Sequence, residues 1–507
     1  MNRTKLFAIN SISAIALQLV SLAVGLITPR IMLYYYGSEI NGLISSLTQF
    51  FSYFMLVEAG LAGASIYALY KPLANRDTES INAIVTATKI FYTKAGYLFV
   101  LLTVSLAVTY PFIVKTAVLN YSETFILVFL LGVSGFIDFF TLSKYRALLT
   151  ADQKMYVISI ATCVHLAINT IITYMMAVIG ADIIVLKTIA LCSVFARTLI
   201  LIIYSKKKYS YLKYDVQPDY QALNKRGDAF YLQILGALHT GAPILIITIV
   251  LQDLKLASVF AIFNMVMSGI GSLLGVFTSG LSASFGDVIA RNESETLKRA
   301  YSEFELFYYC SIAIVYAVSF VLIQPFVDIY TAGITDANYH LPILGILFVL
   351  NGITYSAKTP QGMMVISAGH YKETKVQTTI QGLIMVVLGV VLSFKYGIYG
   401  VMVACILSNF YRDIDLLIYV PNRIVKSNWK ESLIRVMIMI ASIILSVIAC
   451  SIVRVLVVGA IDNYGSWVFA AIVFTIIAAA ITISCYAIFS RAVFIRTVRR
   501  IASLFHH

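Results

Sequence analysis

The chain of 507 residues is 60% hydrophobic and only 12% charged. This excludes an ordinary soluble protein, in which about a quarter of the residues are charged. Apolar runs of about 20 residues or more recur along the whole length, and each is long enough to cross a hydrocarbon core as a helix. The net charge of +13 needs no nucleic-acid partner, because cytoplasmic loops that face anionic headgroups account for it. We therefore expect an all-α integral membrane protein.

Fourteen apolar segments are predicted to cross the membrane. The first lacks a small-residue cleavage site, so we interpret it as a retained helix rather than a signal peptide. All six cysteines fall inside predicted helices, which favours packing roles over a disulfide framework or a metal site. The predicted spans are residues 6–33, 40–69, 90–114, 121–146, 155–180, 183–204, 228–252, 255–285, 302–331, 341–367, 374–395, 398–419, 432–459 and 465–490.

Basic residues alternate along these spans. Lys and Arg cluster in every second loop, from Arg3 and Lys5 at the start to the run Arg491 to Arg500 at the end, and the other loops are nearly bare of them. Because Lys and Arg in short loops mark the cytoplasmic side, both termini are predicted to be cytoplasmic. The longest loop, 205–227, is then cytoplasmic and divides the first six spans from the next six.

Two stretches of sequence recur at an interval of six spans. GLAGASIYALYKPLANRDTES, from Gly60, resembles GLSASFGDVIARNESET, from Gly280, and SVFARTLILIIY resembles SNFYRDIDLLIY, which aligns Arg197 with Arg412. We interpret both arginines as snorkelling to cytoplasmic headgroups. Because six is even, both halves have the same orientation, which indicates a parallel repeat of two six-helix lobes around a central cavity. The predicted divisions are an N-lobe (1–204), a cytoplasmic loop (205–227), a C-lobe (228–419), and two C-terminal helices with a cytoplasmic tail (420–507).

Two predicted spans carry stripes of small or polar residues at helical spacing. The stripe of the first span includes Gln18 and Gly25, and that of the eighth includes Asn264 and Gly275. Small residues at this spacing let helices pack closely in lipid, and the same stripes would suit a hydrated cavity between the lobes. Both interpretations stay open, and we take Gln18 and Asn264 as candidate substrate-binding residues.

The segment ITPRIMLYYYG places Arg30 and Tyr34 near the outer end of the first span. Such residues commonly lie at headgroup level, as a snorkelling arginine and an aromatic belt. They would also suit a substrate, because a guanidinium binds phosphate and an aromatic ring stacks on a sugar. Arg30 and Tyr34 are therefore candidate substrate-binding residues as well.

Four ionisable side chains lie well inside predicted spans: Glu58, Asp138, His239 and Lys358. A central Asp or Lys costs about 2.5–3.5 kcal/mol on insertion scales, so each is expected to face a partner or a cavity. Lys358 is a candidate for substrate binding, and the other three are candidates for ion coupling. Asp138 has a second interpretation as the partner of the basic residues at 144 and 146, and His239 as a hydrogen-bonded structural histidine.

The sequence contains no phosphate loop, His-Glu-x-x-His helix or nucleophile elbow. It therefore offers no ATPase and no recognisable catalytic site, and we expect a protein that is not an enzyme. Any work must come from ion gradients, the membrane potential or downstream consumption of the product. We expect no cofactor and no metal, and coupling to H⁺ or Na⁺ is left open.

The whole chain resembles the polysaccharide repeat-unit flippases of the multidrug/oligosaccharidyl-lipid/polysaccharide (MOP) exporter superfamily. The resemblance rests on the plan of six, six and two spans and on the long middle loop. It also rests on Arg30 followed by Gly37 and Gly42, and on the Gly-Asp at 286–287 followed by VIARNES. It implies that polyprenyl-diphosphate-linked oligosaccharides move from the cytoplasmic to the outer leaflet by alternating access. The cavity of the family is typically cationic, which implies that role for Arg30 and Lys358.

The resemblance further implies a multi-pass protein of the bacterial cytoplasmic (inner) membrane, serving capsule, O-antigen or exopolysaccharide synthesis. The implied partners are the lipid-linked oligosaccharide, the phospholipid bilayer, and a polysaccharide polymerase with its chain-length proteins. Three alternatives are kept. They are a peptidoglycan-precursor (lipid II) flippase, which shares the fourteen-span plan, a cation-coupled drug exporter, which usually has twelve spans, and a membrane polysaccharide polymerase or ligase, for which the external loops are short.

Overall fold

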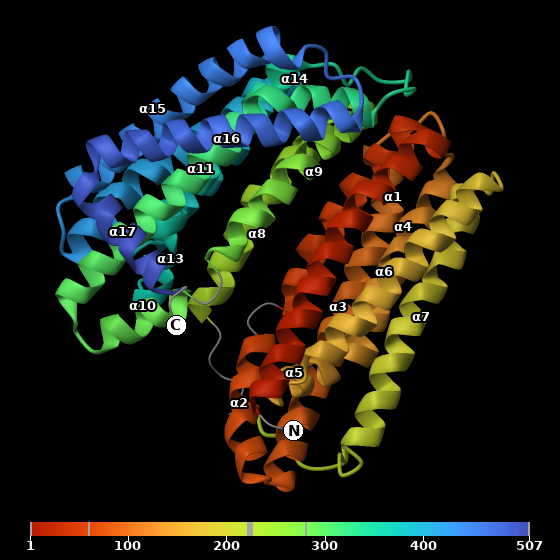
Figure 1. The fold of residues 1–507 in the computed structure, drawn as a ribbon. Coiled ribbons are helices and arrows are strands. Elements are labelled where there is room, and N and C mark those ends of the chain that lie inside the picture. Colours follow the sequence, from red (N-terminus) through yellow and green to blue (C-terminus); the bar gives the residue numbers. More distant parts are fainter. Residues whose placement is uncertain (1–2, 59–60, 221–226, 279–280, 505–507) are drawn as a thin grey trace. The chain divides into compact units, whose positions relative to one another are not determined.

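A computed structural model describes residues 3–58, 61–220, 227–278 and 281–504 of the chain. Within these residues the structure is helical and contains no β-strand, which confirms the expected all-α fold class (Figure 1). The chain divides into two compact units, Met1–Ser258 and Val259–His507.

The first unit contains the helices from α1 to α8 and the first turn of α9 (Figure 1). Its longest helix, α1, consists of two helices joined at Gly37, where φ is 80° and ψ is 174°. This conformation is open to glycine and strained for every other residue. The elements are α1 (Arg3–Phe54), η1 (Met55–Glu58), α2 (Leu61–Asn75), α3 (Thr78–Ile113), α4 (Tyr121–Ile137), η2 (Asp138–Leu142), α5 (Ser143–Ala151), α6 (Met155–Val178), α7 (Ile183–Lys208), α8 (Gly227–Ile249) and α9 (Leu254–Val276).

An apolar core holds α1, α3 and α4 together in the first unit. Leu43, Leu47, Tyr110 and Leu127 are almost fully buried in it. Gly42 lies so close to the start of α9 that an added Cβ would come within 1.8 Å of the carbonyl oxygen of Leu254. Only glycine permits this close approach of α1 to the start of α9.

The second unit contains the rest of α9 and the helices that follow (Figure 1). Its longest helix, α14, is also two helices, joined at Gly397 with a φ of 55°. The elements after α9 are α10 (Leu281–Ala290), α11 (Ser294–Tyr330), α12 (Pro342–Ala357), α13 (Thr359–Ala368), α14 (Lys375–Val420), η4 (Pro421–Val425), α15 (Trp429–Val453), η5 (Arg454–Val458), α16 (Tyr464–Phe489) and α17 (Arg491–Leu504).

The helices α15 and α16 pack on α11. Cys450 and Phe474 are fully buried in the apolar core that they share, and the Trp467 indole donates a hydrogen bond of 3.1 Å to the carbonyl oxygen of Leu322. All six cysteines are free thiols on helices. The last two long helices are therefore built into the second unit rather than loosely attached to it.

Glu305 ties α11, α13 and α15 together. Its carboxylate is fully buried and accepts four hydrogen bonds of 2.8 or 2.9 Å. A buried charge is tolerated only when it is paired and hydrogen-bonded, and a guanidinium supplies the opposite charge here. The four donors are Tyr301, Gln361, Ser432 and Arg435.

Residues with positive φ mark equivalent turns in the two halves of the chain. Those among the described residues of the N-lobe (1–204) are Gly37, Arg76, Gln153 and Gly180, and their counterparts are Gln252, Asn292, Gly369 and Gly397. The paired positions lie 215, 216, 216 and 217 residues apart, in that order. Each lies at a turn between helices, which agrees with the parallel repeat predicted from the sequence. Gly60 and Gly280, where one of the repeated stretches begins, lie outside the described residues.

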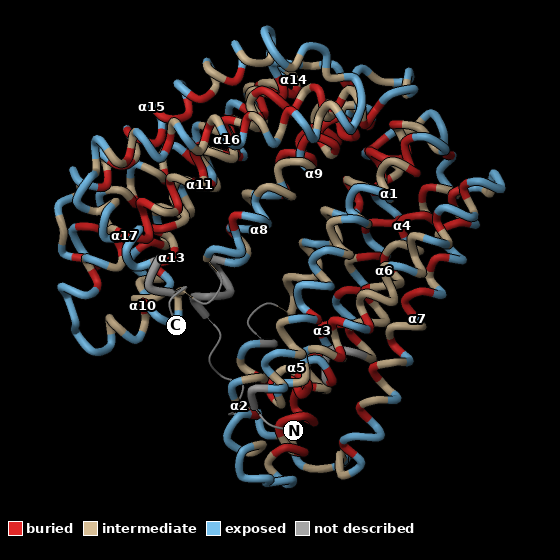
Figure 2. Tube along the Cα trace, viewed as in Figure 1, coloured by how far each residue is buried: buried red, intermediate tan, exposed pale blue. Residues whose placement is uncertain are grey.

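Ten helical stretches in the described part of the chain are long and apolar enough to cross a membrane. Two of them, Lys5–Glu58 and Lys375–Val425, contain predicted spans joined at Gly37 and Gly397. Large apolar side chains are exposed along the helices, and pale blue stretches of the tube in Figure 2 mark the exposed residues. Exposed apolar surface of this extent is stable in lipid rather than in water. The protein is therefore a multi-pass membrane protein, and the number of fourteen crossings stays a prediction.

Candidate functional site

Three of the predicted ionisable residues lie where helices are interrupted. In the first unit, Glu58 ends the 3-10 turn η1, and Asp138 begins the π-helical turn η2 between α4 and α5. In the second unit, Lys358 is the single residue between α12 and α13. An interrupted helix frees backbone polar groups, which lipid tolerates only where protein or water covers them. The interruptions therefore indicate where polar groups gather in each unit.

Asp138 and Arg197 form an ion pair in the first unit. Their side chains are 15% and 17% exposed, so the pair is largely withdrawn from the surface. Asp138 and Arg146 both act electrostatically on Glu58. We call Glu58, Asp138, Arg146 and Arg197 the first-unit cluster. Its two acidic and two basic side chains balance in charge, which lowers the cost of holding them at membrane depth.

The structure corrects the interpretation of the two repeat-related arginines as snorkelling side chains. Arg197 faces Asp138 because α7 packs against both α4 and η2. Arg412 is also withdrawn, with 7% of its side chain exposed, and forms an ion pair with Asp415 on the same helix. An acidic partner inside the protein compensates each guanidinium, so neither needs to reach the headgroups.

Lys358 lies in a polar cluster of the second unit. Its Nζ donates a hydrogen bond to Asn409 Oδ1 of α14 and lies 4.9 Å from the centre of the Tyr355 ring. Asn409 Nδ2 donates to Asn351 Oδ1 at 3.0 Å, and Gln381 Nε2 donates to Asn409 Oδ1 at 3.3 Å. Side chains from α12 and from both halves of α14 therefore meet at the break before α13.

Asp413 lies one helical turn after Asn409 and acts electrostatically on Lys358. Its Oδ1 is buried and has no hydrogen-bond partner within the described residues. The Asp413 carboxylate is therefore compensated by a nearby charge rather than by hydrogen bonds to both oxygens. We call Lys358, Asn351, Gln381, Asn409 and Asp413 the second-unit cluster.

The two clusters lie on corresponding predicted spans of the repeat but not at equivalent positions. Asp138 and Lys358 each lie at the interruption of the fourth predicted span of its repeat, 220 positions apart, whereas the paired turns are 215 to 217 positions apart. In the first unit the acid is at the interruption and its partner Arg197 is on the sixth span. In the second unit the base is at the interruption and Asp413 is on the sixth span. Each unit thus carries an acid and a base between equivalent helices.

The structure does not bring the other predicted site residues into the two clusters. Gln18 and Tyr34 are exposed on α1, and Asn264 is exposed on α9. Arg30 is half-buried on α1, and His239 is half-buried on α8. Their roles in substrate binding or ion coupling stay predictions.

The stripes of small residues do not serve close helix packing at their glycines. An added Cβ at Gly25 or Gly275 would meet no described atom within 4 Å. Asn10, at the start of the first stripe, has a structural role, since it donates to the Gln153 carbonyl at 2.8 Å and accepts from the Tyr156 N–H at 2.9 Å.

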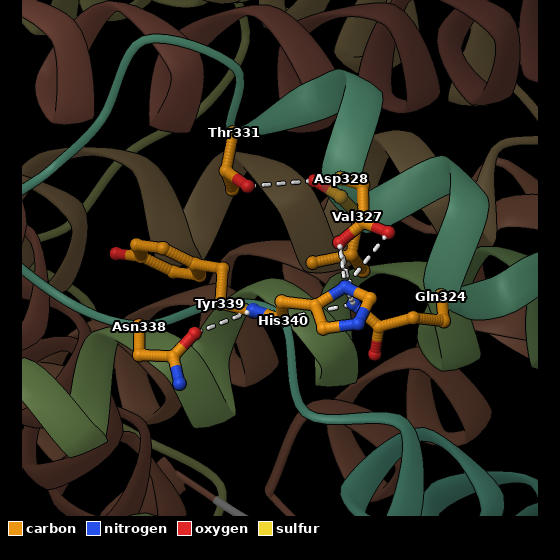
Figure 3. Close-up of polar contacts among 7 residues, drawn as sticks. All are labelled: Gln324, Val327, Asp328, Thr331, Asn338, Tyr339 and His340. Carbon is orange, nitrogen blue, oxygen red and sulfur yellow. Dashed lines mark hydrogen bonds and ion pairs between the residues drawn. The ribbon is translucent and has the colours of Figure 1, made fainter. Parts of the chain in front are cut away.

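A separate polar cluster of Gln324, Asp328, Tyr339 and His340 lies where α11 meets the loop to α12. Figure 3 shows the His340 ring beside the Asp328 carboxylate, where Nδ1 lies 3.0 and 3.1 Å from the two oxygens. Gln324 Nε2 donates to Asp328 at 2.6 Å and to the Tyr339 carbonyl at 3.1 Å. These contacts fasten the loop to the end of α11. Across the described residues, no group of three or more His, Cys, Asp or Glu is placed to hold a metal ion.

Solved structures share this arrangement of helices. The chain matches the lipid II flippase MurJ, in an inward closed conformation, with a TM-score of 0.71 and 13% identity over 95% of this chain and 99% of that chain. It matches an inward-facing multidrug resistance MATE family transporter of the MOP superfamily with a TM-score of 0.64 and 14% identity, over 82% and 98%. The chain has the fold of a MOP-type transporter.

At these identities the likeness establishes the fold alone. No protein-family model and no curated protein sequence matches the chain. Both structural neighbours are transporters, a lipid II flippase and a multidrug resistance transporter. The narrower resemblance to polysaccharide repeat-unit flippases stays an expectation.

Proposed function

We propose that the protein is a flippase that moves polyprenyl-diphosphate-linked oligosaccharide repeat units from the cytoplasmic to the outer leaflet of the bacterial cytoplasmic membrane. The observation that carries the proposal is the fold shared with a lipid II flippase over 95% of the chain. The multidrug transporter covers 82%, a shortfall similar in length to residues 420–507. The greater share of the chain that the lipid II flippase covers favours a flippase over a drug exporter.

The charge distribution suits a polar, anionic substrate attached to a lipid. An oligosaccharide cannot cross hydrocarbon unaided, because each hydroxyl without a partner costs several kcal/mol. Lys358 offers an ammonium at the break between α12 and α13, and Arg30 offers a guanidinium on α1. Alternating access would expose such groups to each side of the membrane in turn.

The membrane potential is sufficient to drive outward movement of the substrate. A diphosphate with about two negative charges gains roughly 4.6 kcal/mol on moving outward across about 100 mV, interior negative, at about 2.3 kcal/mol per charge. Coupling to H⁺ or Na⁺ through Glu58, Asp138 or His239 is therefore compatible with the proposal and is not required by it. Both termini of the protein would lie in the cytoplasm. The product in the outer leaflet would pass to a polysaccharide polymerase and its chain-length proteins.

Depletion of the protein in its native cell tests the proposal. Polyprenyl-linked oligosaccharides are extracted after depletion, and the leaflet that holds them is determined by their accessibility from outside. Complete repeat units trapped on the cytoplasmic side would support the flippase and identify the sugar. Single units accumulating outside would assign the protein to polymerisation instead, and no accumulation together with new sensitivity to cationic drugs would assign it to drug export.

Lipid II transport is the second candidate, favoured by the MurJ likeness. The same depletion distinguishes the two flippases. Accumulation of lipid II on the cytoplasmic side, with other lipid-linked oligosaccharides unchanged, would decide for the peptidoglycan precursor.

A further inference from the structure

The second-unit cluster contains one cation, Lys358, and one anion, Asp413. The two side chains contribute little to each other's hydrogen bonding. The Lys358 ammonium donates to the neutral amide of Asn409 and faces the Tyr355 ring. Asp413 lies one helical turn after Asn409, the amide that Lys358 contacts, and its buried Oδ1 accepts no hydrogen bond within the described residues. By contrast, Asp138 in the first unit is in direct contact with its arginine. The ammonium of Lys358 is therefore the less firmly engaged of the two cations.

We propose that Lys358 binds the diphosphate of the lipid carrier, that this diphosphate displaces Asp413 as the counter-ion of the ammonium, and that Asp413 takes up a proton from solvent when the diphosphate binds. The inference rests on the proposed function. It adds a residue, Asp413, and a linkage between substrate binding and protonation.

The linkage follows from charge balance. With Lys358 and Asp413 both ionised, the pair is neutral, and a diphosphate adds about two negative charges beside an existing carboxylate. Like charges that share one site disfavour each other's ionised form, so a proton on Asp413 favours the bound diphosphate. By reciprocity, the bound diphosphate must favour the proton on Asp413 to the same degree.

The surroundings of the pair contain few other titratable groups that could take over this role. Arg412 and Asp415 are occupied with each other on α14. Tyr309 of α11 interacts electrostatically with Asp413 and accepts a hydrogen bond of 2.8 Å from Gln361. Tyr355 of α12 lies beneath the ammonium. Among these side chains, Asp413 is the carboxylate whose oxygen is left without a donor.

Calorimetric titration of the full-length protein in lipid nanodiscs with farnesyl diphosphate tests the inference. Titrations in two buffers of different ionisation enthalpy report the number of protons taken up on binding. In the wild type, uptake should accompany binding, and affinity should fall by up to about tenfold per pH unit where Asp413 loses its proton. Inorganic pyrophosphate serves as the second probe, and equal affinity for it would show that the diphosphate alone supplies the recognition.

The variants isolate the contribution of Asp413. Asp413→Asn should bind farnesyl diphosphate more tightly than the wild type at high pH, and its residual pH dependence is that of the ligand itself. Asp287→Asn removes an exposed carboxylate of the same unit that pairs with Arg291 at the surface, and it should keep the wild-type pH dependence. The double variant Lys358→Met/Asp413→Asn leaves no unpaired charge that would hinder folding, and it should lose binding.

Two outcomes would overturn the inference. One is an unchanged pH dependence in Asp413→Asn, and the other is undiminished binding by Lys358→Met/Asp413→Asn. The proposed function fails separately, if the wild type binds no polyprenyl diphosphate at all. Binding that depends on Lys358 without proton uptake would contradict only the role of Asp413.

Discussion

At the scale of single residues, nearby groups of opposite charge offset the cost of placing a charged side chain within the membrane. Asp138 is neutralised by Arg197, and Arg412 by Asp415. The Lys358 ammonium donates a hydrogen bond to the Asn409 amide and interacts electrostatically with Asp413. A charge that is balanced but not locked in a close pair is the more suitable one for a transient ligand, because less has to be broken when the ligand arrives.

The charges proposed for the substrate give the first prediction. Arg30→Ala and Lys358→Ala should each impair export of surface polysaccharide while the protein still inserts into the membrane, because a diphosphate would lose its cationic partner. Lys372→Ala is the control, since Lys372 is an exposed lysine in the turn before α14. Wild-type polysaccharide levels in both variants would remove these residues from the substrate path.

The ion pair of the first unit gives the second prediction. Arg197→Met should lower the stability of the purified protein by about 3 kcal/mol, because the first-unit cluster is left with an excess of negative charge. Asp138→Asn/Arg197→Met should recover most of the loss, since no charge remains unpaired. Thermal unfolding in detergent measures both. A double variant no more stable than Arg197→Met would mean that the pair itself, rather than charge balance, stabilises the unit.

At the scale of helices, the apolar runs and their loops could be predicted from the sequence. The short gap between the spans 374–395 and 398–419 corresponds to Gly397, and the gap before residue 40 corresponds to Gly37. Helix interruptions inside spans could not be located in this way, because an apolar run continues through them. The π-helical turn at Asp138 depends on packing among α3, α4 and α7, which no local pattern encodes.

The polar clusters likewise contain some residues that could be predicted from the sequence and others that could not. Glu58, Asp138 and Lys358 could be found from the sequence because an ionisable side chain within an apolar run is costly wherever it points. Their partners could not, since Arg197 lies 59 positions from Asp138 and Asn409 lies 51 positions from Lys358. The amides of Asn351 and Gln381 give a weaker signal still, because an uncharged polar residue is common in a membrane helix.

The attachment of α15 gives a prediction at this scale. Arg435 forms an ion pair of 2.9 Å with Glu305 of α11, and their side chains are 5% and 0% exposed. Arg435→Met should destabilise the protein by about 3–5 kcal/mol because Glu305 is fully buried. Arg291 pairs with Asp287 at the surface, where the side chains are 65% and 60% exposed, so Arg291→Met should cost only about 0–1 kcal/mol. Equal shifts of the two variants in a thermal melt would contradict the role assigned to Glu305.

The bend within α1 gives a matched pair of glycine variants. Gly37→Ala should destabilise the protein by about 1–3 kcal/mol, because its backbone conformation is accessible only to glycine. Gly25→Ala, on the same helix with open space around its Cα, should be neutral or slightly stabilising, since alanine favours a helix. The comparison is made by thermal unfolding, and a neutral Gly37→Ala would show that the connection tolerates a different backbone.

At the scale of the whole molecule, the two halves of the chain turn at equivalent positions and carry charge pairs on corresponding predicted spans. The repeat-related arginines Arg197 and Arg412 each have an acidic partner, on another helix in the first unit and on the same helix in the second. A common backbone plan therefore carries a different arrangement of charges in each unit.

Transfer of the substrate between leaflets is the measurement that tests the central claim most directly. Purified protein is reconstituted into vesicles that carry a polyprenyl-diphosphate-linked oligosaccharide in the inner leaflet, and its arrival outside is followed with a membrane-impermeant lectin. We predict transfer that is faster than in protein-free vesicles and lost in Lys358→Met/Asp413→Asn. Oligosaccharide that stays in its leaflet, while the same vesicles transport a cationic drug, would contradict the flippase.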